Sequence, residues 1–120
     1  MSFTIKEASQ ITGLAAHTIR YYEKEGILPP IERDENGIRI FSEENIFWLD
    51  LVICLKKTNM TVNDIKRIIE LSIQGDSTID ERKSILLGHK NKIASQIEEL
   101  EESMKKIEKK IDFYDGKESC

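Results

Sequence analysis

Apolar residues recur every three or four positions along most of the chain, and short polar or glycine-containing breaks separate these stretches into helices. The first helix is predicted to begin at a capping box, residues 4–7 (Thr-Ile-Lys-Glu), in which the hydroxyl and the carboxylate each satisfy a backbone N–H. Gly13 ends this helix, and a second short helix over residues 15–24 is expected to bury Ile19 and Tyr22. Two short helices on either side of a glycine-containing turn are typical of a helix-turn-helix.

The next segment has the pattern of a β-hairpin. A proline pair at 29–30 prevents a further helix, and two short runs, 31–33 and 38–41, flank the sequence Asp-Glu-Asn-Gly at 34–37. The Asn-Gly pair within it is a strong hairpin-turn signal. Because strands this short do not persist alone, the hairpin must lean on another element, as a wing does.

Two longer helices are predicted after the hairpin. Ser42 caps the first of them, which runs to about Thr58, and residues 61–64 start the second with a shortened capping box. The residues expected to be buried on these helices are Ile46, Leu49, Val52, Ile53, Leu55, Ile65, Ile68, Ile69 and Leu71. The polar break at 74–77 marks a domain boundary, so a first domain is predicted over residues 1–75.

The last segment carries the clearest periodic signal, two series of apolar residues that each repeat every seven positions. One series consists of Leu86, Ile93, Leu100, Ile107 and Tyr114, and the other of Ile97, Met104 and Ile111. Together they form the a and d positions of a coiled coil. A helix over 79–114 would be roughly 50 Å long, and a domain of this size cannot cover such a stripe along its whole length. We therefore predict a homodimer through a coiled-coil helix within residues 76–114, followed by a short tail at 115–120.

Charge favours one orientation of the paired helices. An acidic block at 98–102 precedes a basic block at 105–110, so antiparallel pairing centred near Ser103 would set unlike charges against each other. Most of these residues point outward from the seam, which makes the favourable energy small.

Composition and charge narrow the class of protein. The 120 residues carry 22 acidic and 18 basic side chains, a formal net charge of −4, and neither half of the chain is basic. Bulk charge therefore predicts no nucleic-acid partner, and any such function has to rest on local placement. No apolar run approaches the roughly 20 residues of a membrane span, and the first residues lack the features of a signal peptide. Two cysteines, Cys54 and Cys120, exclude a disulfide framework. We expect a soluble cytoplasmic protein with no membrane partner.

The sequence offers no basis for catalysis. It contains no glycine-rich phosphate loop, no cluster of metal-ligating residues and no nucleophile–base pair that spacing alone would suggest. We therefore predict that the protein is not an enzyme, holds no metal and needs no cofactor.

Three stretches of sequence, taken with the order of the elements, resemble the MerR family of bacterial transcription regulators over essentially the whole chain. They are Thr-Ile-Arg-Tyr-Tyr-Glu at 18–23, Gly-Ile-Leu at 26–28 and Asn-Gly-Ile-Arg-Ile-Phe at 36–41. The resemblance implies a mainly α protein, with a winged helix-turn-helix DNA-binding domain followed by a long dimerisation helix that forms an antiparallel coiled coil. It also implies that the homodimer binds double-stranded promoter DNA and bends and untwists an overlong promoter spacer, so that RNA polymerase engages both of its elements. An effector would bias which DNA deformation the dimer favours.

Residues on the second helix, on the ribbon and near the end of the third helix are candidates for DNA contact. An arginine early in a recognition helix pairs with guanine or clamps a phosphate, and residues at the start of that helix usually reach base edges. The candidates are His17, Thr18, Arg20, Tyr21, Arg39, Lys56 and Lys57. Any one of them, taken alone, has a plain alternative as a solvated surface residue. The family usually has Tyr where Phe41 stands and commonly Gly where Asn59 stands, and Asn tolerates the left-handed conformation.

The chain also contains a candidate sensor residue. Cys54 precedes a basic pair, Lys56 and Lys57, in a pattern that resembles the short, thiol-containing MerR members responsive to aldehydes and other electrophiles. Nearby ammonium groups would favour the nucleophilic thiolate. The alternative is a buried cysteine that acts as a small hydrophobe, in a regulator with a non-thiol signal. Metal-sensing members use further cysteines that this chain lacks, and Cys120 is expected to take no part in regulation. A coiled-coil protein-interaction module is the alternative outside transcription.

Overall fold

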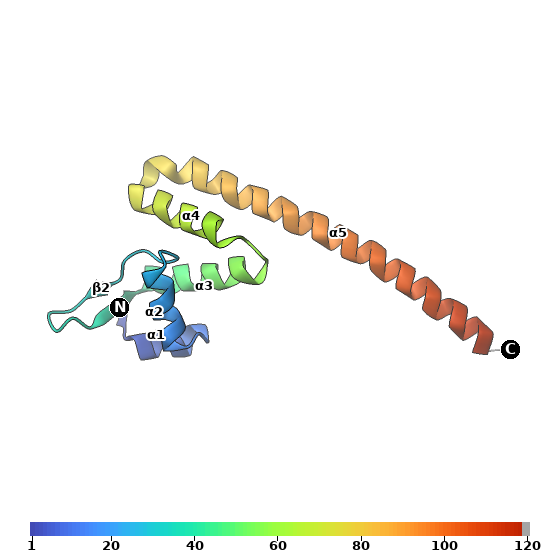
Figure 1. The fold of residues 1–120 in the computed structure, drawn as a ribbon, viewed down its shortest axis with the longest axis horizontal. Helices are drawn as coiled ribbons and strands as arrows, with labels where there is room; N and C mark the ends of the chain where they lie inside the picture. Colours follow the sequence, from blue (N-terminus) through green and yellow to red (C-terminus); the bar gives the residue numbers. More distant parts are fainter. Residues whose placement is uncertain (119–120) are drawn as a thin grey trace. The chain divides into compact units, whose positions relative to one another are not determined.

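The computed structural model describes residues 1–118, which form two compact units, one from Met1 to Ile85 and the other beginning at Leu86 (Figure 1). The elements are β1 (Ser2–Phe3), α1 (Ile5–Thr12), α2 (Ala16–Lys24), β2 (Glu32–Arg33), β3 (Arg39–Ser42), α3 (Glu43–Lys57), α4 (Val62–Gln74), the 3-10 helix η1 (Asp76–Thr78) and α5 (Ile79–Glu118). The mainly helical fold predicted from the sequence, with a helix-turn-helix, a small wing and a long C-terminal helix, is confirmed. Cys120, for which we expect no regulatory part, lies outside the described residues.

The helix-turn-helix is formed by α1 and α2, and local sequence sets its ends. The predicted capping box is present, since Thr4 Oγ1 accepts from the Glu7 N–H (3.1 Å) and Glu7 Oε1 accepts from the Thr4 N–H (3.0 Å). Gly13 ends α1 with a φ of 78° in the left-handed region, which a residue without Cβ adopts at little cost. Ile19 and Tyr22 are buried, as predicted, so α2 packs on α1 and turns its opposite face to solvent.

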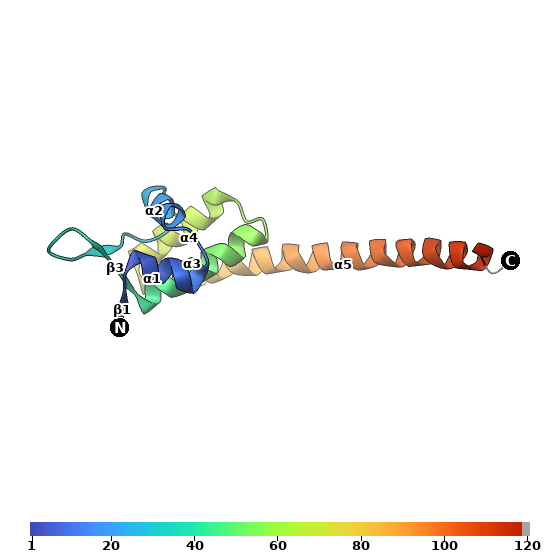
Figure 2. The same ribbon diagram turned by 90° about the horizontal axis from the view of Figure 1, so that it is seen from below.

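The wing is part of a three-stranded antiparallel sheet with the strand order β1-β3-β2. β2 and β3 pair as predicted, with Arg33 opposite Arg39, and Gly37 closes the turn with a φ of 78°. The sequence does not predict β1, which pairs Phe3 with Phe41 and lies with β3 against α1 (Figure 2). A strand of two residues is too short to show a period of its own, so only its contacts reveal it. Phe41 is fully buried, and the sheet thereby anchors the wing to the helical core.

α3 and α4 complete the core of the N-terminal unit. Ser42 and Asn45 cap α3 reciprocally: Ser42 Oγ accepts from the Asn45 N–H (3.1 Å), and Asn45 Oδ1 accepts from the Ser42 N–H (2.8 Å). Thr61 Oγ1 caps α4 by accepting from the Asp64 N–H (3.1 Å). Between the two helices, Asn59 has a φ of 67°, the left-handed conformation expected where the family commonly has glycine.

The predicted burial of α3 is wrong at two positions. Its buried face consists of Leu49, Val52 and Leu55, whereas Ile46 and Ile53 are only half-buried. Both lie at one edge of this face, because α3 carries apolar residues on more than one side and the period alone overstates the width of its buried stripe. On α4 the prediction is confirmed, with burial of Ile65, Ile68, Ile69 and Leu71.

A cluster of hydrogen bonds joins α4 to α5 through η1. Gly75 leaves α4 with a φ of 105°, a conformation that favours glycine. The hydroxyl oxygen of the buried Thr78 lies 2.6 Å from the Leu71 carbonyl oxygen and 2.8 Å from that of Gly75. Arg82 donates from Nε to Thr78 Oγ1 and from Nη2 to the Gly75 carbonyl, both at 3.1 Å. Side chains of the following elements thus satisfy carbonyl groups at the end of α4.

The C-terminal unit continues α5 past Tyr114, the end expected from the heptads, to Glu118. Six of the heptad residues are half or more exposed in the single chain, from 50% for Ile97 to 67% for Leu100. These six, the heptad stripe, are Ile97, Leu100, Met104, Ile107, Ile111 and Tyr114. The described part of the chain contains no helix long and apolar enough to cross a membrane.

Candidate nucleic-acid interface

The solvent face of α2 carries the residues that the sequence predicts for base contact. Arg20 and His17 are exposed, Tyr21 is 55% exposed and Thr18 is half-buried. The buried Ile19 fixes the rotation of the helix, so these side chains are directed away from the core. The predicted orientation of α2 is confirmed.

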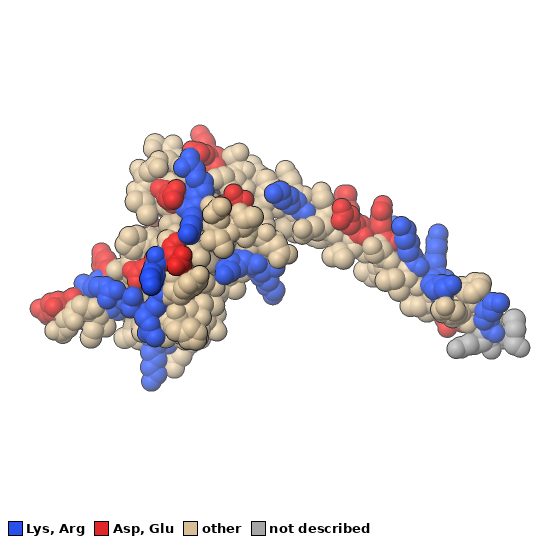
Figure 3. Space-filling view, in the orientation of Figure 1, with Lys and Arg blue, Asp and Glu red and all other residues tan. Residues whose placement is uncertain are grey.

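An open hollow of about 530 Å³ lies between α2 and the wing, and we call it the α2–wing hollow. Its lining residues are His17, Arg20, Tyr21, Glu23, Lys24, Arg33 and Arg39. Four of the seven are permanent cations and one is an acid. Figure 3 shows Lys and Arg side chains gathered beside the wing, while acidic side chains lie at its tip. The local charge of this surface is therefore opposite to the net charge of −4 of the chain.

Glu23 is the acidic member of the hollow. Its Oε2 accepts from the Ile31 backbone N–H at 2.8 Å, and its Oε1 accepts from Arg39 Nε at 2.7 Å. Burial on its own would raise the pKa of the Glu23 carboxyl. The hydrogen bonds from Arg39 and Ile31, together with the charges of Arg39 and Arg33, outweigh this effect and leave the pKa below its ordinary value. Glu23 is thus held as a carboxylate.

The two wing arginines face each other across the β2–β3 ladder. The Arg39 side chain is 23% exposed and ion-paired with Glu23 through Nε, which leaves its terminal nitrogens as the groups that a phosphate could reach. Arg33 donates from Nη1 to the Gly37 carbonyl at 2.9 Å, which braces the turn. The wing therefore presents two guanidinium groups on partly fixed side chains.

The two lysines predicted near the end of α3 differ in their surroundings. Lys56 Nζ lies 5.0 Å from the centre of the Tyr22 ring, a cation–π contact that places it beside α2. Lys57 is exposed. Neither of them lines the α2–wing hollow.

Cys54 is a free and exposed thiol on α3. The alternative that it is packed in the core of this chain is wrong, because the buried face of α3 lies on the side of Leu49, Val52 and Leu55. Its outer face also carries Phe47, two turns earlier and 69% exposed. Lys56 is directed toward Tyr22 and away from Cys54. Lys57, three residues after Cys54, is therefore the lysine of the predicted basic pair that lies on the same side of α3 as the thiol.

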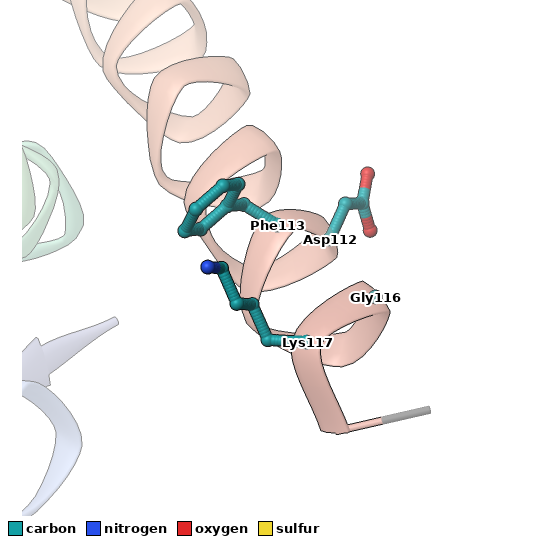
Figure 4. A pocket seen from close by; sticks show the side chains of 4 residues that line it. All are labelled: Asp112, Phe113, Gly116 and Lys117. Atoms are coloured by element: carbon teal, nitrogen blue, oxygen red, sulfur yellow. The ribbon is translucent and has the colours of Figure 1, made fainter. Parts of the chain in front are cut away.

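The described residues give little support to two other kinds of site, a metal site and a ligand site in a second hollow on α5. No group of three or more His, Cys, Asp or Glu residues within the described range could hold a metal ion. A second hollow lies at the end of α5, where the lining residues are Asp112, Phe113, Gly116 and Lys117 (Figure 4). The ammonium group of Lys117 lies 5.4 Å from the centre of the Phe113 ring. All of these lining residues belong to one helix, so they do not enclose a ligand.

Sequence reasoning missed three residues of the α2–wing hollow: Glu23, Lys24 and Arg33. Lys24 lies four residues after Arg20 and hence on the same face of α2, which helical spacing alone could have indicated. The place of Arg33 in the hollow could have been predicted from the hairpin register, because Arg33 is the cross-strand partner of Arg39. No local pattern points to the contacts of Glu23.

Comparison with known proteins gives matches along most of the chain. The model of the MerR HTH family regulatory proteins matches residues 3–72, and a model described as MerR, DNA binding matches residues 48–110. An uncharacterized HTH-type transcriptional regulator of Haemophilus influenzae is 42% identical over 114 residues, which cover 95% of this chain and 84% of that protein. AdhR, an HTH-type transcriptional regulator of Bacillus subtilis, is 34% identical over 89 residues, which cover 74% of this chain and 64% of that protein.

A solved structure is similar over the full length of the chain. It is the crystal structure of HiNmlR, described as a MerR family regulator lacking the sensor domain, bound to promoter DNA. The sequences are 40% identical and the TM-score is 0.85, with coverage of 100% of this chain and 95% of that chain.

The fold and the α2–wing hollow define a winged helix-turn-helix DNA-binding regulator. The matches to the family model and to these relatives make the identification specific: the chain belongs to the MerR family of transcription regulators. The relatives named above are described as regulators of transcription.

Proposed function

We propose that this protein binds double-stranded promoter DNA as a homodimer, with α2 in the major groove and the wing on the neighbouring backbone or minor groove. The observation that carries the proposal is the α2–wing hollow, in which cations from a helix and a hairpin converge on one surface. Phosphate contacts of this kind position a protein on DNA, and base contacts give sequence specificity. The similarity to HiNmlR, which was crystallised bound to promoter DNA, supports DNA binding by this chain.

Individual roles follow from place on the surface. His17 and Thr18, at the start of α2, are placed to reach base edges. Arg20, one half-turn further and solvent-exposed, pairs with guanine or holds a phosphate, and the neighbouring exposed Tyr21 contacts a phosphate. Arg39 contacts the backbone or the minor groove through its terminal nitrogens.

Lys56 and Lys57 add phosphate contacts at the end of α3. Lys56 lies beside α2 through its contact with Tyr22, so its ammonium group can serve the same DNA segment as the recognition helix. Lys57 is exposed, and a long lysine side chain can reach a phosphate in several conformations.

Dimerisation is supported by the heptad stripe of α5. Its six apolar residues are each half or more exposed in the single chain, and an exposed apolar stripe at heptad spacing is the seam of a coiled coil. A second copy of the same helix covers it. Antiparallel pairing sets the acidic block at 98–102 against the basic block at 105–110 of the partner.

The dimer activates transcription by deforming the promoter. Two recognition helices at a fixed separation hold two half-sites, and the DNA between them bends and untwists to fit. RNA polymerase then engages both promoter elements across an otherwise overlong spacer. The deformation energy of the spacer, and not a contact with its bases, is what the dimer controls.

Cys54 receives the signal, which we propose to be an aldehyde or another electrophile. The observation in favour is that the thiol is free and exposed on the outer face of α3. With an aldehyde, the Cys54 thiolate sulfur forms a bond to the carbonyl carbon, the C=O π electrons move to oxygen, and water supplies its proton. The product is a thiohemiacetal, formed with no change in oxidation state.

The proposal is tested by titrating the protein into a fluorescently labelled duplex taken from upstream of its own gene, at a series of KCl concentrations. We expect tight binding that weakens steeply with salt, because each neutralised phosphate contributes about −0.9 to the slope of log K against log salt. A scrambled duplex of equal length is the control. Binding that is absent, or that does not respond to salt, would contradict DNA recognition and favour the protein-interaction module.

A further inference from the structure

A carboxylate lies inside the cationic surface that faces DNA. Glu23 lines the α2–wing hollow together with Arg20, Lys24, Arg33 and Arg39, and at that place its negative charge repels phosphate. A residue that only weakened binding would have no reason to be held there by two hydrogen bonds. The bonds themselves indicate another role.

Both oxygens of the Glu23 carboxylate are used, and each reaches a different end of the wing. Oε2 accepts from the backbone N–H of Ile31, eight residues on and just before β2. Oε1 accepts from Nε of Arg39, sixteen residues on and at the start of β3. The Glu23 side chain is only 16% exposed, so these charge-assisted bonds are shielded from solvent.

The wing needs such an attachment. β1 and the buried Phe41 anchor β3, but β2 is an edge strand of only two residues, and strands this short are marginal without further support. Pro29 and Pro30 carry no N–H, so that of Ile31 is the first backbone donor after the pair. Arg39 sits opposite Arg33 in the ladder, and holding one of them in place also orders the other.

We propose that Glu23 is a positioning residue for DNA binding, which ties the wing to the recognition helix and fixes the Arg39 guanidinium for phosphate contact. The inference rests on the proposed contact of α2 and the wing with DNA. It assigns to an acidic side chain a favourable effect on the affinity for a polyanion. The wing loses its conformational entropy when the protein folds. DNA binding then costs no further ordering of the wing, because the surface is already formed.

The sign of one substitution separates this role from simple repulsion. Glu23→Gln removes a negative charge from the hollow but keeps the size of the side chain. If Glu23 acted only through its charge, the variant would bind DNA more tightly. The amide of glutamine has one accepting oxygen and no charge, so it cannot replace both charge-assisted bonds to Ile31 and Arg39. We therefore expect DNA binding to weaken about tenfold, the effect of one lost charge-assisted bond.

Glu32→Gln is the matched control. Glu32 is exposed on β2, next to Ile31, and its replacement by Gln also removes one negative charge, here from the wing, without touching either hydrogen bond of Glu23. We expect equal or tighter binding for this variant. Binding is measured by anisotropy on the labelled duplex at fixed salt, and thermal unfolding of both variants is followed by circular dichroism.

A second variant keeps the test decisive if Glu23→Gln loses stability. Arg39→Lys retains the positive charge but lacks the fixed Nε donor that pairs with Glu23. We expect weaker binding here too, and no additional loss when both substitutions are combined, because two residues that act through one contact are not additive. Faster hydrogen exchange at the Ile31 amide in Glu23→Gln would report directly on release of the wing.

Three results would overturn the inference: tighter binding by Glu23→Gln, additive losses in the double variant, or unchanged exchange at Ile31. Arg20→Ala, measured in parallel, tests the proposed function separately. If Arg20→Ala loses affinity while Glu23→Gln does not, the DNA surface stands and the positioning role is wrong. If Arg20→Ala has no effect either, the assignment of α2 to DNA is at fault.

Discussion

Replacement of Met104 by glutamate should convert the proposed dimer into monomers. Met104 lies in the middle of the heptad stripe, between Leu100 and Ile107, and is 54% exposed in the single chain. A charge at this position leaves the helix itself intact, because glutamate is a good helix former. The substitution therefore tests the seam and not the secondary structure.

The magnitude follows from the exposed fraction. Full burial of a methionine side chain contributes about 1.5–3 kcal/mol, so pairing adds roughly half of that, about 1 kcal/mol in each protomer. Met104→Glu removes this contribution twice and sets two carboxylates in an apolar seam, where each costs several kcal/mol. A total above about 5 kcal/mol raises the dimer dissociation constant by more than about three powers of ten.

The assay is sedimentation velocity over a range of protein concentrations, with helix content followed by circular dichroism. Ser95→Glu is the control, because Ser95 is exposed on the same helix outside both heptad series and receives the same charge. We expect dimers for the control and monomers for Met104→Glu, which should also lose operator binding. A Met104→Glu protein that sediments as the wild type does would refute the assignment of the seam.

Three further predictions concern the N-terminal unit. Arg20→Ala should weaken operator binding at least about tenfold, and the salt slope should fall by about 0.9 per lost contact if Arg20 holds phosphate but stay unchanged if it reads guanine; unaltered affinity would contradict either role. Cys54→Ser, made in a Cys120→Ser background, should keep DNA binding and abolish induction by aldehyde in a promoter–reporter assay, so a variant that is still fully inducible would end the sensor proposal. Because the pKa of Glu23 is lower in the folded than in the unfolded chain, its carboxylate stabilises the fold above the unfolded pKa, and this contribution disappears as the pH falls through the folded pKa. The urea midpoint should therefore fall less between pH 7 and pH 3 for Glu23→Gln than for the wild type. Parallel curves of urea midpoint against pH for the two proteins would argue against a lowered pKa of Glu23.

Most of the fold could be predicted because its determinants are local. The capping box at Thr4 and the helix cap at Ser42 are present as the sequence indicates, since each depends on residues within one turn of the helix start. The left-handed Asn59 and the buried face of α4 likewise follow from a single residue and a single period. β1 could not be predicted, because two residues carry no pattern and its evidence lies in pairing with a strand almost forty positions away.

The site could be predicted in part for the same reason. Exposure of Arg20 and Tyr21 follows from the burial of their neighbours on one short helix. The role of Glu23 could not be found, because it depends on contacts with Ile31 and Arg39 that only the packed wing brings together. Sequence patterns report which face of an element is buried, and they do not report which side chains meet across elements.

The net charge of −4 gives a reason why the proposed DNA binding would need the proposed dimer. Counterion release supplies most of the affinity of basic DNA-binding proteins for any sequence, and an acidic chain gains little of it away from its cationic surface. One α2–wing hollow presents four permanent cations, so the electrostatic contribution to the DNA affinity of a monomer is small. In the proposed dimer, pairing through the heptad stripe would join two such surfaces in one molecule, and the second would engage at a high effective concentration once the first is bound. The affinity of such a dimer would depend on the spacing and deformability of two half-sites, as the proposed action on a promoter spacer requires. Met104→Glu, which touches no DNA, should for this reason weaken operator binding at least as much as Arg20→Ala does.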